Sequence, residues 1–587
     1  MNRLEALFAR SRRKPITVVY DEAYRLPLSG AEAVAMPIET RRCDDALSYA
    51  LHQRAFSERH VVAPTPISYE ALSRVHTAAY LESLQDPLTL ARIFAVDPSD
   101  VYVDELLRTV RLACGGTLWA ARHTLATKRP TMNLLGGFHH AAPDRGGGFC
   151  AVNDMAVAIA ALRAEGFTGR VAVLDFDCHP PDGTAACLGH DPSVWLGSVS
   201  GTSWSELDGV DDVVLPEGST DEPYLEAVQT LLTRMPDVQL VFVLAGGDVL
   251  AGDRLGTLKL SLHGVRRRDL LVIERLGSLP QVWLPAGGYS AHAWKVLAGT
   301  ALALAFRSTT PISTDADPLA SRMSRIARSL PSESLSGEED TVTDADIAEA
   351  LSGRRAGPPK LLGFYTAEGL EFALEQYRIL PLLRRLGFDE LHVVIDRAGL
   401  ADRARLMGRD TTRDTPVTLV QLEVERRRVG DGTFLFVNWL SMRNPRAQFS
   451  STRPKLPGQE TPGLGLAKEM TQLLGLMAKR LVLDGVAFQP SWFHMAFTAR
   501  HTARFLSPER QGRFEALVRD LRTLPLLVST RAVAEGRVLL NGQPYTWEAN
   551  EMIAWRELRE DPAYGAAVAH ERERCHFTVV PSPGAPS

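Results

Sequence analysis

The most constraining stretch of the sequence is residues 170–184, RVAVLDFDCHPPDGT. Residues 170–176 are apolar and rich in β-branched side chains, which predicts a buried strand. Asp175, Asp177 and His179 follow at intervals of two, so an extended chain directs all three to the same side. Open α/β sheets bind ligands at the carboxyl ends of their strands. Two carboxylates and an imidazole there suit a divalent metal such as zinc, although acidic residues after a strand also commonly cap the next helix.

Composition narrows the class of protein. The chain has 587 residues, 45% of them hydrophobic, which allows two or three domains, or one large domain and a second. A net charge of −5 argues against direct nucleic-acid binding through bulk positive charge. The six cysteines form no CxxC pair, which indicates a reducing compartment. Without a signal-like run or an apolar run of about 18 residues, we expect a soluble, cytoplasmic protein with no membrane partner.

Strands and helices alternate through the first half. Apolar runs predict strands at residues 15–20, 170–176, 194–200, 240–244 and 282–285, and helical patterns predict helices at residues 39–54, 67–84, 102–126, 154–164, 222–234 and 264–276. This alternation predicts a parallel, doubly wound α/β sheet. Three of the strands end in chemically useful residues: the Asp-x-Asp-x-His set, Asp248 and Tyr289.

A pair of adjacent histidines, His139 and His140, ends another apolar run and precedes the Gly-rich loop at residues 146–148. Two neighbouring imidazoles are costly to charge together, so one is biased toward the neutral form that a general base requires. Taken alone, the pair would more simply be two solvated loop histidines. Glycines in the loop would allow its backbone to pass close to a ligand.

Taken together, these motifs resemble those of the histone deacetylase family, which includes bacterial acetylpolyamine amidohydrolases and acetoin-utilisation proteins. The resemblance covers residues 17–307. The matching segments are the histidine pair, Gly148-Phe149-Cys150 as a wall of the substrate tunnel, residues 175–179 as the metal strand, residues 247–261 around the third ligand, and Gly287-Gly288-Tyr289 as the tyrosine loop. The resemblance implies an arginase/deacetylase-like parallel α/β domain.

The resemblance also implies a role for each matching residue. The implied metal ligands are Asp177, His179 and Asp248, and the metal would be Zn2+ or Fe2+. The implied catalytic groups are His139 and His140, held by Asp175 and Asp182, with Tyr289 donating to the oxyanion. Gly148 and Phe149 would contact substrate. A structural K+ would lie around Asp175, Asp177, His179, Ser198 and Val199.

The implied activity is a zinc-dependent amidohydrolase that removes acetyl or other acyl groups from acylated amines by metal-activated water. The substrate would be an acylated lysine or an acylated polyamine. Two alternatives stay open: a catalytically degenerate module that binds acylated ligands, and a bifunctional deacylase and acyltransferase. The sequence leaves the oligomeric state undetermined.

The sequence departs from the family pattern at two places. Pro180-Pro181 follows the metal histidine where the family has His-Gly; two prolines fix φ and remove two N–H donors, which leaves the path of this loop open. Residues 201–214 lack the usual Pro-Gly-rich segment, so either Trp204 replaces its aromatic tunnel residue or the tunnel is wider. Asp100 is either a contact to the substrate backbone or a surface carboxylate.

The domain plan that follows has a deacetylase-like domain at residues 1–312, a linker at residues 313–358 rich in Ser, Thr, Asp and Gly, and an accessory α/β domain at residues 359–587. In the last, the order of a strand, Gly463-Leu-Gly465, a long helix and a strand resembles the acetyl-CoA cradle of GNAT acetyltransferases, which implies cofactor contacts at Gly463 and Gly465. Glu460 stands where that family favours Arg or Gln. The alternative is an accessory or oligomerisation domain.

Overall fold

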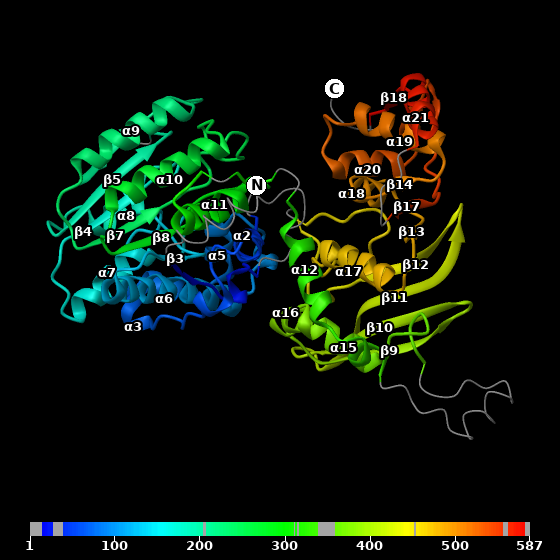
Figure 1. Cartoon of the computed structure of the whole chain (residues 1–587), viewed down its shortest axis with the longest axis horizontal. Helices are drawn as coiled ribbons and strands as arrows, with labels where there is room; N and C mark the ends of the chain where they lie inside the picture. Colours follow the sequence, from blue (N-terminus) through cyan, green and yellow to red (C-terminus); the bar gives the residue numbers. More distant parts are fainter. Residues whose placement is uncertain are drawn as a thin grey trace, which may run out of the picture. The chain divides into compact units, whose positions relative to one another are not determined.

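The structure is a computed structural model that describes residues 15–27, 39–203, 207–309, 311–313, 316–337, 359–450, 453–555 and 561–581. The chain divides into two compact units, the first extending to Ser321 and the second beginning at Arg322. Figure 1 shows a sheet with flanking helices in each unit.

The first unit is built on an eight-stranded sheet in the order β2-β1-β3-β8-β7-β4-β5-β6. Every pairing in it is parallel. The strands are β1 (Thr17–Val19), β2 (Val61–Val62), β3 (Thr131–Asn133), β4 (Val171–Asp175), β5 (Val194–Ser200), β6 (Val210–Val214), β7 (Leu240–Leu244) and β8 (Gln281–Leu284). The predicted parallel α/β fold class is therefore confirmed.

Helices cover both faces of this sheet (Figure 1). They are α2 (Arg42–His52), α3 (Tyr69–Leu72), α4 (Ala78–Ser83), α5 (Pro87–Phe94), α6 (Val103–Thr127), α7 (Asp154–Ala164), α8 (Asp182–Leu188), α9 (Asp221–Arg234), α10 (Leu262–Leu276) and α11 (Ala293–Phe306). Alternate residues of β4 enter opposite cores: Val171 and Val173 pack with α5 to α7, and Ala172 and Leu174 pack with α2 and α9 to α11. A strand that is buried on both faces is a nearly continuous apolar run, and such a run can be recognised in the sequence.

Two local expectations for the first unit are wrong. The single helix expected at residues 67–84 is two short helices, α3 and α4, because Thr77 caps a new helix with its side chain. In addition, no strand was expected at residues 201–214, but that segment contains the edge strand β6, whose side chains are partly exposed and include two adjacent aspartates. A half-exposed edge strand lacks the apolar run that identifies the central ones.

The expected linker at residues 313–358 is also partly wrong. Helices α12 (Pro318–Ser329) and α13 (Ser332–Ser336) occupy its first part, and Met323 and Leu335 are buried. The segment is rich in serine, so the helical spacing of these apolar residues was not recognised in the sequence. The short helix that we expected at residues 345–351 lies outside the described residues.

The second unit is built on a seven-stranded sheet in the order β14-β17-β13-β12-β11-β10-β9, with a separate sheet β16-β15-β18. Its strands are β9 (Phe388–Ala398), β10 (Ala401–Asp410), β11 (Thr415–Val429), β12 (Gly432–Met442), β13 (Gly485–Phe488), β14 (Arg504–Phe505), β15 (Val538–Leu540), β16 (Gln543–Pro544), β17 (Met552–Trp555) and β18 (Phe577–Val579). β9 to β12 form an antiparallel meander, and β12 and β13 are parallel. The predicted second α/β region is confirmed.

The helices of the second unit are α15 (Ala367–Gln376), α16 (Ile379–Arg385), α17 (Ala467–Arg480), α18 (Phe493–Ala499), α19 (Pro508–Asp520), α20 (Leu526–Ala534) and α21 (Pro562–Arg574). The apolar spacing of residues 368–386 predicts one amphipathic helix, but the structure has two, α15 and α16, because Arg378 adopts a left-handed conformation with φ 63°. Helices α18, α20 and α21 and strand β10 are not predicted from the sequence; in β10, arginines and aspartates alternate with the apolar residues. Asn541-Gly542 between apolar runs predicts a hairpin, and it joins β15 to β16.

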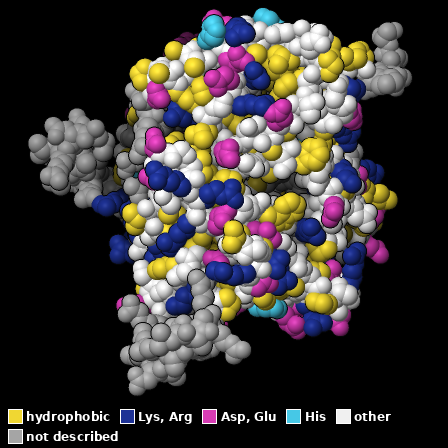
Figure 2. Space-filling view, turned by 90° about the vertical axis from the view of Figure 1, so that its right-hand side faces the viewer, with side chains coloured by type: hydrophobic (Ala, Val, Ile, Leu, Met, Phe, Trp, Pro, Cys, Tyr) yellow, Lys and Arg dark blue, Asp and Glu magenta, His cyan; other side chains and the backbone are white. Residues whose placement is uncertain are grey.

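Two surface observations bear on the expected partners. In the part of the chain that the structure describes, no helix is long and apolar enough to cross a membrane. Figure 2 shows one face of the molecule, on which basic and acidic side chains are interspersed rather than gathered by sign.

Candidate metal centre and active site

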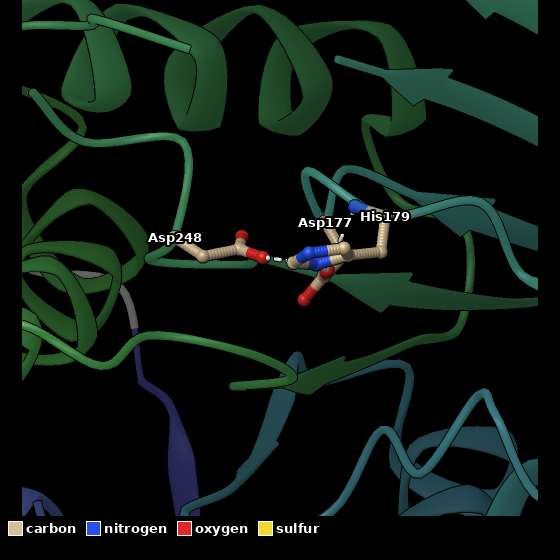
Figure 3. A group of neighbouring side chains, drawn as sticks. All are labelled: Asp177, His179 and Asp248. Atoms are coloured by element: carbon tan, nitrogen blue, oxygen red, sulfur yellow. Dashed lines mark hydrogen bonds and ion pairs between the residues drawn. The ribbon is translucent and has the colours of Figure 1, made fainter. Parts of the chain in front are cut away.

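The sheet topology brings Asp177, His179 and Asp248 together. β4 and β7 are parallel neighbours, and the last residue of β4, Asp175, is paired with Leu244 at the end of β7. The loops that leave these two strand ends therefore emerge side by side. Figure 3 shows Asp248, from the loop after β7, facing His179, from the loop after β4.

The three side chains form a compact ligand set. Nδ1 of His179 lies 2.9 Å from a carboxylate oxygen of Asp248 and 3.2 Å from one of Asp177. One ligand atom from each residue lies within 4.8 Å of the others. The backbone of Gly287 can lie against this ligand set because glycine has no side chain: a Cβ there would stand 2.5 Å from Oδ2 of Asp177. Its N–H donates to that same oxygen at 2.6 Å.

The negative charges of this ligand set favour a bound cation. Burial raises the pKa of Asp248 to about 8, and the charge of Asp177 adds to the rise. Burial lowers the pKa of His179, but its hydrogen bonds to both aspartates outweigh that effect and bring the pKa to about 11. A cation between these two buried carboxylates would offset their mutual repulsion. The donor set fits a divalent cation such as Zn2+ or Fe2+.

The histidine pair lies next to this set, with each imidazole held by its own carboxylate. The rings of His139 and His140 are 4.0 Å apart between centroids. Nδ1 of His139 lies 2.9 Å from Asp175, and Nδ1 of His140 lies 2.7 Å from Asp182, the first residue of α8. The structure thus brings together all four residues that the sequence paired.

The two histidines differ in their affinity for a proton. Burial lowers the pKa of His139, but the charges of Asp175 and Asp177 outweigh it and raise the pKa to about 9. Burial also lowers the pKa of His140, and the charge of His139 lowers it further. His140 is therefore the neutral member of the pair near pH 7. Nδ1 of His140 is hydrogen-bonded to Asp182, so Nε2 is the ring nitrogen that would accept a proton when His140 acts as a base.

Pro180-Pro181 leaves the loop able to deliver Asp182 to His140. The N–H of Asp182 donates to the carbonyl of Pro180, and the N–H of Ala185 donates to the carbonyl of Pro181, which starts α8. The N–H of Thr184 donates to the carbonyl of His139 at 2.8 Å and ties the helix start to the histidine pair. The two prolines lack backbone N–H groups, but the hydrogen bonds of this turn use their carbonyl oxygens as acceptors.

A cavity opens beside the histidine pair and is lined in part by Phe149 and Tyr289. Their rings are 5.2 Å apart between centroids. Burial raises the pKa of Tyr289 well above its usual value, and the charges of Asp177 and Asp248 raise it further, so its hydroxyl stays protonated and can donate. Gly148, with φ 51°, also lines the cavity, and a Cβ there would stand 2.4 Å from the His140 ring.

Other predicted contacts are placed differently. Asp100 is fully buried and is not among the described residues that line the cavity, so its interpretation as a surface carboxylate is wrong. Trp204 lies outside the described residues. Ser198 and Val199 are fully buried on β5. Gly463 and Gly465 precede α17, and the expected order of strand, glycines, helix and strand is present; cofactor contacts there stay a prediction.

Sequence reasoning missed three residues that hold the site in place. Arg42 donates to the carbonyls of Ala286 (2.6 Å) and Gly288 (3.2 Å), on the loop that leads to Tyr289. Asp154 accepts the N–H of Phe138, directly before the histidine pair, at 2.8 Å. No local pattern marks Arg42, which lies far from its partners in the sequence. The third is Asp253, which was part of a matched motif but had no assigned role.

Asp253 couples the metal loop to the tyrosine loop. Its Oδ2 accepts the N–H groups of Tyr289 (2.8 Å) and Ser290 (2.9 Å). Its Oδ1 accepts the N–H groups of Leu255 (3.1 Å) and Gly256 (3.3 Å) on its own loop. One carboxylate therefore fixes the backbone of Tyr289 relative to the segment that follows Asp248. This makes Asp253 a positioning residue.

We expect Asp253→Ala to lower kcat for the reaction proposed below by about 10- to 100-fold, because small displacements of a positioned donor have effects of that size. Metal content should be unchanged. Asp253→Asn keeps one accepting oxygen and should lose less. Steady-state kinetics with metal analysis of each variant would test this. Equal kcat in the wild type and in Asp253→Ala would contradict the role.

The first half of the chain is similar to known proteins. A family model described as the histone deacetylase domain matches residues 36–304. Histone deacetylase 2 of Arabidopsis thaliana is 32% identical over 302 residues, covering 48% of this chain and 77% of that protein. A probable deacetylase of Archaeoglobus fulgidus is 27% identical over 298 residues, covering 47% and 81%. A solved HDAC homologue from Aquifex aeolicus is 21% identical with a TM-score of 0.41, covering 49% and 83%.

Proposed function

Because this chain belongs to the histone deacetylase family, we propose that its first unit is a metal-dependent amidohydrolase that removes acyl groups from acylated amines. The observation that carries the proposal is the convergence of three groups at one end of the sheet. These groups are the Asp177, His179 and Asp248 set, the carboxylate-held histidine pair, and Tyr289 at the adjoining cavity.

In this proposal the chain's own residues orient the substrate and move the protons. A divalent ion held by the three ligands would supply positive charge that polarises the amide carbonyl and acidifies water. Nε2 of His140 accepts the proton of the attacking water and later returns it to the leaving amine. Asp182 fixes the tautomer of His140 and stabilises its charged form. The Tyr289 hydroxyl donates to the oxygen that gains negative charge.

We propose zinc or ferrous iron as the bound metal, since both suit one imidazole and two carboxylates. We also propose a structural K+ around Asp175, Asp177, His179, Ser198 and Val199. Strand pairing places the fully buried Ser198 beside Asp175 at the end of β4. A buried hydroxyl beside a buried carboxylate offers oxygen ligands of the kind that such a cation needs.

The substrate is proposed as an acylated lysine or an acylated polyamine. Purified protein should hydrolyse members of a panel of acyl-lysine peptides and acylpolyamines. A chelator should abolish turnover, and Zn2+ or Fe2+ should restore it. The preferred compound would define the substrate class.

Tyr289→Phe is the variant to test on this panel, because it removes one hydroxyl at the cavity. It should lower kcat by about 100- to 1,000-fold, the effect typical of one oxyanion donor. Tyr69→Phe removes a hydroxyl from a largely exposed tyrosine on α3 and should have no effect. If metal-loaded wild type were as inert as Tyr289→Phe on every compound, the amidohydrolase would be rejected in favour of a module that binds acylated ligands.

A further inference from the structure

A second cavity, of about 110 Å³, is lined wholly by residues of the second unit. Its floor is one face of the β9–β11 meander. Leu406 of β10 is paired with Val393 of β9 and with Val420 of β11, so the three side chains form a row. Ala404 and Leu422 form the next row on the same face. Because side chains alternate along strands, both rows project to one side.

Helices α15 and α17 form the walls. The lining residues of α15 are Leu370, Ala373 and Leu374, and those of α17 are Met470, Leu473, Leu474, Leu476, Met477 and Arg480. Both sets follow helical spacing, so each helix turns an apolar stripe toward the sheet. An apolar space of this size offers water too few hydrogen-bond partners and suits an apolar guest.

The cavity has one polar end, formed by Tyr365, Tyr377 and Arg480. Neither tyrosine hydroxyl hydrogen-bonds another described residue, and both tyrosines are largely buried. Burial raises the pKa of Tyr365 to about 12, while the charge of Arg480 opposes the rise, which places the guanidinium close to this ring. Two hydroxyls and a cation thus lie at the end of a hydrocarbon-lined space.

Arg480 has hydrogen bonds but no opposing charge. It donates to Ser332 Oγ (3.2 Å) and to the carbonyls of Ala327 (2.8 Å) and Leu330 (3.3 Å), near the end of α12. No carboxylate within the described ranges forms an ion pair with it. These neutral partners leave N–H groups of the guanidinium for an anion. Arg480 is partly exposed, as are lining residues of α15 and α17.

From this arrangement we propose that the second unit binds a small amphiphile, with an aliphatic chain in the cavity and an anionic head group at Arg480, Tyr365 and Tyr377. A fatty-acid carboxylate has this chemistry. The site belongs wholly to the second unit, so the inference does not depend on the deacylase proposed for the first.

Isothermal titration calorimetry of the full chain with butanoate, pentanoate and hexanoate, whose chains suit the cavity volume, tests the proposal. Affinity should rise about three- to fourfold per added methylene, the increment expected for burying a CH2 group. Arg480→Gln should weaken hexanoate binding at least tenfold and leave hexanol binding unchanged, because only the carboxylate needs the cation.

The variant Ala373→Trp supplies the cavity control. Ala373 lies on a partly exposed wall, so a tryptophan there should occupy the space without unfolding the unit, which circular dichroism would verify. Ala367→Trp, at the start of the same helix and absent from the described lining, is its matched partner and should bind like wild type. No binding by folded wild type, or equal binding by both tryptophan variants, would overturn the proposal.

Discussion

His140→Ala is expected to lower kcat for deacylation by about 100- to 10,000-fold, the range typical for loss of a positioned general base. The physical reason is that His140 is the neutral member of the pair and has an Nε2 lone pair aligned by Asp182. Bound metal should stay stoichiometric, because none of the three ligands is changed. The measurement is steady-state kinetics on the preferred acyl substrate, with metal content determined on the same preparation.

His190→Ala is the control for this variant, since His190 is exposed at the end of α8 and away from the site. It should leave kcat unchanged. A His140→Ala protein with full metal content and a kcat within about threefold of wild type would remove His140 from the mechanism. His139 could not simply replace it as the base, because its two aspartates hold it in the charged form, which has no lone pair to accept a proton.

Asp248→Asn is expected to abolish stoichiometric metal binding. Loss of a partner outside the ligand set already costs roughly 10- to 100-fold in affinity, so loss of a ligand should exceed about 100-fold. Asparagine keeps the shape and the acceptor for the N–H of Cys178 but removes the charge that burial already disfavours. We therefore expect the metal-free variant to be at least as stable as metal-free wild type.

Thermal unfolding with and without added Zn2+ separates these effects. Metal should raise the Tm of wild type, because binding only to the folded state stabilises it, and should leave the Tm of Asp248→Asn unchanged. Asp237→Asn, an exposed substitution before β7, should respond like wild type. An equal Zn2+-induced rise in Tm for Asp248→Asn would show that the ion binds elsewhere, and the proposed metal centre would be wrong.

The two variants also distinguish the parts of the site from each other. His140→Ala should lose turnover and keep the metal, whereas Asp248→Asn should lose both. If both variants lost metal, the histidine pair would be a structural support for the ligands rather than an acid/base pair. Metal stoichiometry is therefore as informative as the rate in this comparison.

Most residues of the candidate site could be identified in the sequence because they belong to short motifs at strand ends. Asp175, Asp177 and His179 share one strand end, and parallel strands bring their carboxyl ends to the same edge of a sheet. The central strands are buried on both faces, which makes β7 apolar throughout and β4 apolar up to Asp175. The second unit was harder to predict, because β10 alternates arginine and aspartate with apolar residues and the apolar spacing of α12 is embedded in a serine-rich segment.

The sequence by itself determined the family and the parallel fold of the first unit, and the family resemblance of its motifs pointed to the candidate metal ligands and to the histidine pair with its carboxylates. Only the tertiary structure decided which remote groups hold the site. Arg42 reaches the loop before Tyr289 across 246 residues, and Asp253 fixes that loop from the segment after Asp248. The apolar cavity of the second unit was likewise decided by packing. Helical and strand periodicity identify apolar faces, but whether facing surfaces fill the space between them depends on side-chain volumes brought together only by folding.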